Sequence, residues 1–209
     1  MLIPAAGSRP PARRQSRPAP GFSLLELMVT VSVFGLLIAA ALPTFSTWVS
    51  NSRVRSVTEN LQNGLRLAQT EAIRRNRTVV FALTNDPPGL EAEAVENGKG
   101  WAVFSVGLLA DEDLEFIQGG ELGSVANDVT VTGPASLCFG LSGRLVDPTD
   151  ATGVAGEDCG LGNATFEVRR DGADRNLNAI VSAAGQIRLC DPAQTLSDTT
   201  PEGCPAAED

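Results

Sequence analysis

Residues 21–42 read GFSLLELMVTVSVFGLLIAAAL, and the 21 residues from Phe22 to Leu42 contain one charged side chain, Glu26. As an α-helix this run would be roughly 31 Å long, which matches the hydrocarbon core of a bilayer. Four arginines and no acid precede it within residues 1–21. Because flanking arginines stay in the cytoplasm, we expect one membrane-spanning helix over residues 22–42, with the rest of the chain on the far side of the membrane.

A cleaved secretory signal is the alternative interpretation of this segment. It would have a basic start, an apolar run and a small-residue cleavage site at Ala39-Ala40-Ala41. Glu26 disfavours this interpretation, because a charge in an apolar helix costs about 2.5–3.5 kcal/mol near the centre and less near an end. A discarded segment has no reason to carry that cost, and the helical pattern also continues beyond Leu42.

Residues 43–77 have the pattern of an amphipathic helix. Apolar residues recur at steps of three and four, with arginines and glutamates between them. The apolar positions are Val54, Val57, Leu61, Leu65, Ala68 and Ala72. This spacing predicts a helix that packs one face on a core.

Residues 78–209 contain short apolar runs separated by turn residues, which predict an acidic, β-rich globular domain. Ala183-Ala184-Gly185 favours a hairpin between the last two runs. With the helix, the pattern predicts an α+β fold in which a long N-terminal helix packs on an antiparallel β domain. We expect the Gly-, Pro- and acid-rich loops 85–100 and 147–163 to be mobile. The expected strands are Val79–Leu83, Trp101–Val106, Leu114–Ile117, Val129–Val131, Leu137–Phe139, Thr165–Val168, Ala179–Ser182 and Gln186–Leu189.

The composition removes most enzyme chemistries and argues against a general nucleic-acid binder. The chain has no His, no Tyr and a net charge of −9. Without His, neither Ser-His-Asp nor Cys-His nucleophiles nor imidazole metal sites can form. Residues 79–209 carry 22 acids and six cations, a net charge of −16, which repels phosphates. We therefore expect no enzyme, no cofactor and no nucleic-acid partner.

Four cysteines allow three disulfide pairings, and disulfides persist on the far side of the membrane. Sequence proximity favours Cys138–Cys159 and Cys190–Cys204. The second bridge would close a 15-residue loop, a constraint worth about 3 kcal/mol in the chain-entropy model. A zinc site is the rival interpretation, but the spacings are not C-x-x-C.

Two acidic stretches offer oxygen ligands for calcium. They are Asp111-Glu112-Asp113 and residues 171–178, which contain two aspartates and two asparagines. Neither follows the spacing of an EF-hand loop. We therefore predict no metal site.

Gly21-Phe22-Ser23-Leu24-Leu25-Glu26-Leu27 resembles the leader-peptidase site of type IV pilins and type II secretion pseudopilins. The match combines a short basic leader, Gly before the cut, Phe after it, Glu as the fifth mature residue and about 20 apolar residues. Residues 65–76 with Val79-Val80, residues 100–104 and residues 185–190 resemble the GspH/FimT (FimU-like) family of minor pilins. That resemblance implies a type IV pilin-like fold.

The resemblance implies how the chain is processed and assembled. A prepilin peptidase would remove the basic leader, residues 1–21, by cutting after Gly21, and would N-methylate Phe22. Glu26 would then neutralise the amine of a neighbouring subunit in the membrane. The alternative is that Glu26 lies at the headgroup level and is solvated. The implied partners are the peptidase, other minor and major pilins through the N-terminal helix, and an inner-membrane assembly platform.

The resemblance also implies a structural function, that of a minor type IV pilin that helps to initiate or cap pilus assembly. The chain would start as a single-pass inner-membrane protein with its domain in the periplasm, and then enter a pilus or pseudopilus. The first alternative is a minor pseudopilin of a type II secretion system. The second is a DNA-uptake receptor at a pilus tip.

The DNA-uptake alternative depends on one motif. Some relatives bind DNA through a C-terminal Gly-Arg-x-Arg, and the matching residues here are Gly185-Gln186-Ile187-Arg188. Gln186 replaces the first Arg of the motif, which leaves Arg188 as a lone, weak contact for DNA. The competing interpretation is a plain hairpin in which Arg188 pairs with a local acid.

Overall fold

The structure, a computed structural model, describes residues 21–107, 112–126, 128–147, 159 and 162–206. Apart from Gly21, the expected leader lies outside this part of the chain, as do Asp111 and most of loop 147–163. Residues 43–209 form one compact unit, and residues 1–42 form another.

Helix α1 runs over Leu24–Arg75 and includes Pro43. It ends where Asn76 adopts a positive φ of 55°. The Asn76 N–H donates to the Ile73 carbonyl, and the Arg77 N–H donates to the Ala72 carbonyl. These two bonds form a Schellman motif, in which asparagine tolerates the left-handed conformation that stops the helix. The chain can therefore turn into a strand within three residues.

Two sheets follow α1. The first has the order β3-β2-β1-β5 and is antiparallel throughout. The second has the order β4-β6-β7-β8-β9 and is antiparallel except for its last pair. The strands are β1 (Val79–Thr84), β2 (Gly100–Ser105), β3 (Glu115–Glu121), β4 (Thr130–Thr132), β5 (Ser136–Phe139), β6 (Ala164–Arg169), β7 (Leu177–Val181), β8 (Ile187–Thr195) and β9 (Gly203–Cys204).

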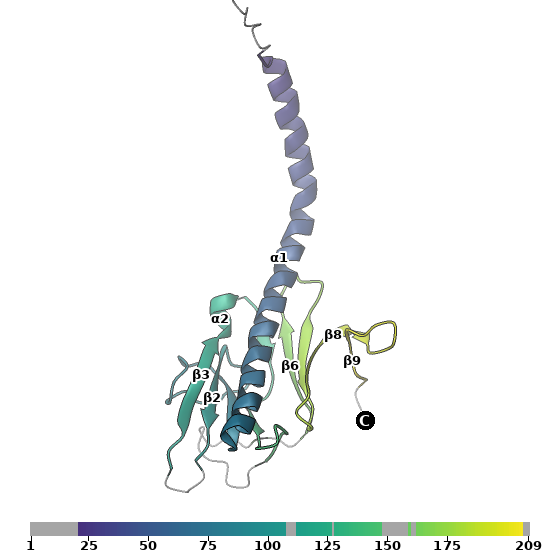
Figure 1. The fold of residues 1–209 in the computed structure, drawn as a ribbon. Helices are drawn as coiled ribbons and strands as arrows, with labels where there is room; N and C mark the ends of the chain where they lie inside the picture. Colours follow the sequence, from purple (N-terminus) through teal and green to yellow (C-terminus); the bar gives the residue numbers. More distant parts are fainter. Residues whose placement is uncertain (1–20, 108–111, 127, 148–158, 160–161, 207–209) are drawn as a thin grey trace, which may run out of the picture. The chain divides into compact units, whose positions relative to one another are not determined.

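The main core lies where the amphipathic face of α1 meets both sheets (Figure 1). Val54, Val57, Leu61, Leu65, Ala68 and Ala72, the predicted apolar positions, are each at most 1% exposed. Gly64 lets the helix approach closely, since a Cβ there would lie 2.8 Å from the Trp101 ring and 3.0 Å from Phe81. These contacts confirm the predicted α+β architecture of a helix packed on β-strands.

A second core covers the outer face of the first sheet. Ala92 and Ala94, from the loop after β1, are each 6% exposed and pack in a cluster that includes Phe104 and Cys138. The Val95 N–H donates to the Leu83 carbonyl, which fixes the loop against β1. The small apolar residues of loop 85–100 therefore cover a sheet face that would otherwise be exposed. The mobility expected for the rest of the loop stays a prediction.

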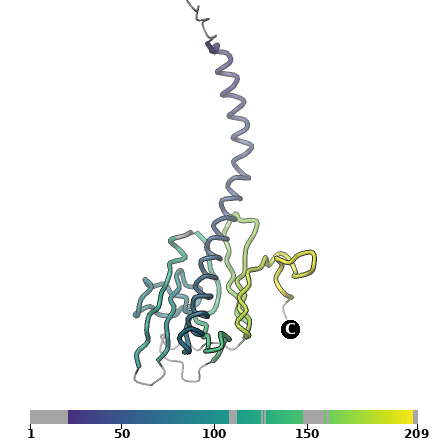
Figure 2. The backbone as a smooth tube through the Cα atoms, viewed as in Figure 1, coloured from purple at the N-terminus to yellow at the C-terminus, as the bar shows by residue number. Residues whose placement is uncertain are grey.

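All eight expected strands are present, with shifted ends. The largest shifts are in β3, which extends to Glu121, and in β8, which extends to Thr195. Two elements have no counterpart among the expected ones: a short helix α2 (Leu122–Val125) and β9, which pairs parallel to the end of β8. β9 and the loop before it project to one side of the strands (Figure 2).

Candidate functional site

The start of α1 carries the residues that the sequence assigns to processing and assembly. Gly21 and Phe22 precede the helix, and Phe22 is 85% exposed. Ser23 caps the helix, because its Oγ accepts a hydrogen bond of 3.2 Å from the Glu26 backbone N–H. Ser23 and Glu26 have the spacing of a capping box, in which the acid at the third helical position lies near the positive end of the helix dipole.

The apolar part of α1 is a surface that the described chain does not cover. Among the described residues, α1 is the one helix that is long and apolar enough to cross a membrane. None of the residues in its most apolar stretch is buried. The hydroxyls of Thr30 and Ser32 donate to the backbone carbonyls of Leu27 and Met28 at 2.9 and 2.7 Å. Because these hydroxyls are satisfied within the helix, the surface presents almost only hydrocarbon.

Ion pairs fasten the domain part of α1 to the second sheet. Asp128 accepts hydrogen bonds from Arg53 at 2.7 Å and from Arg170 Nε at 2.8 Å. Arg170 also donates to Ser50 on the helix. The hydrogen bond from Arg170, with the nearby charge of Arg53, lowers the pKa of Asp128 below its usual value. The carboxylate is therefore ionised at neutral pH and bridges helix and sheet.

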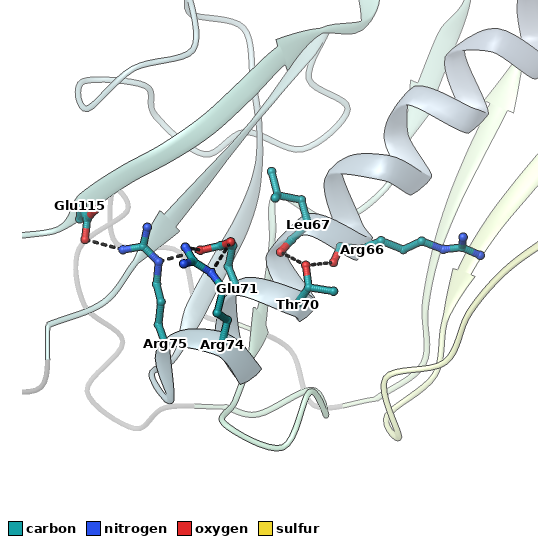
Figure 3. Close-up of polar contacts among 7 residues, drawn as sticks. All are labelled: Arg66, Leu67, Thr70, Glu71, Arg74, Arg75 and Glu115. Atoms are coloured by element: carbon teal, nitrogen blue, oxygen red, sulfur yellow. Dashed lines mark hydrogen bonds and ion pairs between the residues drawn. The ribbon is translucent and has the colours of Figure 1, made fainter.

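A second ionic network fastens the last turn of α1 to β3 (Figure 3). Glu71 accepts from Arg74 at 2.6 Å and from Arg75 at 2.7 Å, and Arg75 reaches Glu115 at 2.6 Å. The hydrogen bonds from Arg74 and then Arg75 lower the pKa of Glu71. The side chain of Arg66 extends away from this network (Figure 3).

Gln69 joins the same helix to two turns. Its Nε2 donates to the carbonyls of Gly143 at 2.8 Å and Gly185 at 2.7 Å. Gly185 has a φ of +82°, and a Cβ there would lie 2.0 Å from the Gly143 oxygen. Both the conformation and the close approach require glycine. Gly185, the first residue of the segment that matches the DNA-binding motif, thus has a structural role in this fold.

Arg188 is exposed on β8. Among the described residues, its side chain makes no hydrogen bond or ion pair. The expectation that Arg188 pairs with a local acid was wrong. In β8 the acid that does pair is Asp191, which Arg175 contacts at 3.3 Å. The hairpin itself is as expected, with the Gly185 N–H donating to the Ser182 carbonyl at 2.7 Å.

The cysteines form two disulfides, Cys138–Cys159 and Cys190–Cys204, the pairing that sequence proximity favours. The first bridge lies within the second core and joins Cys138 of β5 to Cys159, and the second ties β8 to β9. No group of three or more acidic, Cys or His side chains that could hold a metal occurs within the described residues. Each bridge links two separate segments of the domain.

Sequence reasoning missed two groups of residues at this site. The N-cap Ser23 has a local signal, the Ser-x-x-Glu pattern before an apolar run. The partners Asp128, Arg170 and Glu115 have none, because they lie 40 or more residues from their partners on α1. Such long-range ion pairs depend on the tertiary fold.

Comparisons with known proteins agree with this arrangement. Residues 57–185 match the family described as type II transport protein GspH, and residues 17–42 match the prokaryotic N-terminal methylation motif. A type IV major alpha-pilin of Moraxella bovis is 34% identical over 62 residues, which are 30% of this chain and 38% of that pilin. The chain thus matches well under half the length of this relative.

Two kinds of solved structure are similar in fold. The type IV minor pilin FimU of Pseudomonas aeruginosa PAO1 is 21% identical, with a TM-score of 0.49 over 75% of this chain and 98% of FimU. The minor pseudopilin EpsH of the Vibrio cholerae type 2 secretion system is 14% identical, with a TM-score of 0.43 over 66% of this chain and 96% of EpsH. At these values the assignment depends on the family matches. Since the GspH match alone spans well over half of the residues, the chain belongs to the GspH family of minor pilins and pseudopilins and carries their N-terminal methylation motif.

Proposed function

We propose that this chain is a minor type IV pilin, a structural subunit that helps to initiate or cap assembly of a pilus. The observation that carries the proposal is the division of α1. Its N-terminal part has an apolar surface that the described chain leaves unburied, and its C-terminal part is fastened into a disulfide-bonded domain. Such a surface needs lipid before assembly and the helices of other subunits afterwards.

The proposal divides the chain into four parts. Residues 1–21 are the leader, residues 22–42 cross the inner membrane, residues 43–77 form the amphipathic half of the helix, and residues 78–209 form the domain. The two disulfides favour an oxidising compartment, which supports a periplasmic domain. A structural role also fits a site built from caps, ion pairs and apolar surface, and we propose no enzymatic activity.

Glu26 is the residue on which assembly depends in this proposal. Cleavage after Gly21 places a methylated amine at Phe22, one residue before the N-cap Ser23. The positive end of the helix dipole adds to the charge of that amine. A carboxylate from the first turn of a neighbouring subunit would offset both, and two buried charges are tolerated when they neutralise each other.

The experiment compares Glu26→Ala with Glu59→Ala. Glu59 is an exposed acid on the same helix, and among the described residues it pairs only with Arg55, one turn away. Both variants should be cleaved and N-methylated. Glu26→Ala should be depleted from sheared pili, because its neighbour's amine lacks a partner in the bilayer, whereas Glu59→Ala should enter pili at the wild-type level. Normal incorporation of Glu26→Ala would refute the neutralisation role.

A type II secretion pseudopilin is the second candidate, favoured by the family match itself, whose description is that of a type II transport protein. The two functions predict different losses after deletion of the gene. Loss of surface pili with normal export of secreted enzymes supports the pilin function. Loss of export with normal pili supports the pseudopilin function. Complementation with the wild-type chain is the control for both.

A DNA-uptake receptor is the third candidate, and the observation in its favour is the exposed Arg188, which has no ion-pair partner among the described residues. The same hairpin lacks the first Arg of the motif, because Gln186 occupies that position. The binding test for this candidate is given in the Discussion.

A further inference from the structure

The segment between the apolar run and the first charged residue of the domain has an unusual surface. No charged side chain occurs between Glu26 and Arg53. Within this stretch Phe45 and Trp48 are 61% and 65% exposed, and their ring centroids are 6.0 Å apart. The two rings therefore form one aromatic patch on α1, which we call the Phe45–Trp48 pair.

This exposure contrasts with that of the other aromatic residues of the domain, of which Phe116 is half-buried and the rest are buried. Phe81, Trp101, Phe104, Phe139 and Phe166 are each at most 5% exposed. The Trp101 indole N–H donates to Asn60 Oδ1 at 2.8 Å, whereas the Trp48 indole N–H has no hydrogen-bond partner among the described residues. The pair thus combines exposed apolar rings with the polar indole N–H of Trp48. This combination is favourable at a boundary between an apolar medium and water.

Three hydroxyl side chains around the pair are already satisfied by the helix. The Ser46 and Thr47 hydroxyls donate to the Pro43 carbonyl at 2.8 and 3.3 Å, and the Ser50 hydroxyl donates to the Ser46 carbonyl at 2.9 Å. Hydroxyls bonded to their own backbone need little water. This part of α1 can therefore lie in a layer that is poorer in water than bulk solvent.

We propose that the Phe45–Trp48 pair is an interfacial anchor that seats in phospholipid at the boundary between headgroups and acyl chains. The proposal rests on the proposed membrane-spanning role of residues 22–42. Glu26 and Trp48 lie 22 residues apart, about 33 Å along a helix, which is close to the roughly 30 Å thickness of the hydrocarbon core. A helix with Glu26 near one boundary of that core therefore places Trp48 near the other boundary. Tryptophan is enriched at this depth because its ring is apolar and its N–H is polar.

The anchor would hold the unassembled subunit at a fixed depth. Arg53, the first charged residue beyond it, would then lie in water and remain free to bind Asp128, as the structure shows. The rival occupant of the pair is the helix of a neighbouring subunit, which would leave the rings in water until assembly.

The experiment uses the full chain in vesicles of phosphatidylethanolamine and phosphatidylglycerol, with bromine either near the headgroup end or near the tail end of the acyl chains. The chain has two tryptophans, so Trp101→Phe leaves Trp48 as the single emitter. Headgroup-proximal bromine should quench Trp48 about twofold more than tail-end bromine, and aqueous iodide should quench it weakly. Trp48→Phe is the matched control, because the buried Trp101 should respond to none of the three quenchers. If Trp101→Phe does not fold, the difference between wild type and Trp48→Phe gives the same quantity.

The possible outcomes distinguish failure of the proposed anchor from failure of the proposed membrane-spanning role of residues 22–42. A chain that does not float with the vesicles refutes the membrane-spanning role itself. A chain that floats, with Trp48 quenched by iodide and not by brominated lipid, refutes the anchor alone and leaves the pair to a neighbouring subunit. Stronger quenching by tail-end bromine also refutes the anchor, because it places Trp48 inside the hydrocarbon core.

Discussion

Glu26 and Glu71 show how surroundings decide what an acidic residue does on one helix. Glu71 accepts hydrogen bonds from Arg74 and Arg75, and its side chain is 12% exposed. Its charge is used inside the fold, where it holds the end of α1 to β3 through Arg75. Glu26 has no such partner among the described residues and stands alone in an apolar run. Its charge is therefore available to another molecule.

Asp128 should make stability depend on acid. Its pKa is lowered in the fold by the hydrogen bond from Arg170 and the charge of Arg53, so its contribution is present above the unfolded pKa of about 3.9 and is lost as the pH falls through the lower folded value. Asp128→Asn should thus unfold at lower urea than wild type at pH 7. The gap should close as the pH falls well below 4, where wild-type Asp128 is also neutral. A gap that stays constant down to acid pH would refute this role.

Gln69 should contribute to stability through its two hydrogen bonds. Gln69→Leu removes the donor from the carbonyls of Gly143 and Gly185, and we expect a loss of about 1–3 kcal/mol in the free energy of unfolding. Gln62→Leu is the matched control, since Gln62 lies on the same helix and makes no side-chain hydrogen bond with the described residues. Urea titration of the fragment from residue 43 onward measures both. Equal stability of the two variants would contradict a stabilising role for the two hydrogen bonds of Gln69.

The last two strands are held together mainly at their ends. β9 pairs with β8 at Asp191 and Thr195, and the disulfide Cys190–Cys204 closes the loop between them. The Asp191 side chain is buried and accepts hydrogen bonds from the Ala193 N–H at 2.9 Å and from Arg175. This projecting loop has little apolar contact, so the covalent bond should carry much of its order.

Removing that disulfide should lower thermal stability. The chain-entropy model gives about 3 kcal/mol for a loop of this length, so Cys190→Ser/Cys204→Ser should melt at a clearly lower temperature than wild type by circular dichroism. Cleavage by a glutamate-specific protease at the exposed Glu202 should also become faster. An unchanged melting temperature with unchanged cleavage would show that the loop is ordered without its bridge.

The hairpin of β7 and β8 should not bind DNA. A lone Arg188 offers one phosphate contact, and each contact contributes only roughly 0.9 to the log–log salt slope against an acidic background. The fragment from residue 43 onward should leave duplex DNA unshifted at about 0.15 M salt, and Gln186→Arg should raise binding only slightly. Tight binding that disappears in Arg188→Ala would instead favour the uptake-receptor function.

At the scale of the whole molecule, local periodicity predicted most of the fold. The steps of three and four in α1 identified the buried face, because a helix that packs on one side must repeat at that spacing. The short apolar runs of β1 and β2 located two strands to within one residue at each end. These elements depend on neighbours in sequence, which a pattern can record.

The features that the sequence did not predict depend on contacts between distant segments. β9 is two residues long, and it is joined to β8 by the disulfide and by parallel pairing. Loop 85–100 was expected to be mobile because of its composition, yet Ala92 and Ala94 fill the outer face of the first sheet. Composition does not show which surface a loop will cover.

The candidate site divides in the same way. Glu26 and the cysteine pairs follow from local features, a charge in an apolar run and short separations. That Arg188 has no partner among the described residues does not follow, because an acid near in sequence can lie elsewhere in space. Arg170 illustrates this point: it follows Arg169 directly, yet it binds Asp128 and Ser50 while Arg169 binds Glu167.

In the proposed function, assembly depends on processing at the Gly21–Phe22 bond. Mass spectrometry of the protein extracted from membranes measures it directly. We predict an N-terminus at Phe22 that carries one methyl group, with residues 1–21 absent and two disulfides intact. Gly21→Arg should block the cut, because a bulky cation replaces a hydrogen next to the scissile bond. A mature N-terminus at Leu42 would instead establish a conventional signal peptide and contradict the assignment as a pilin subunit.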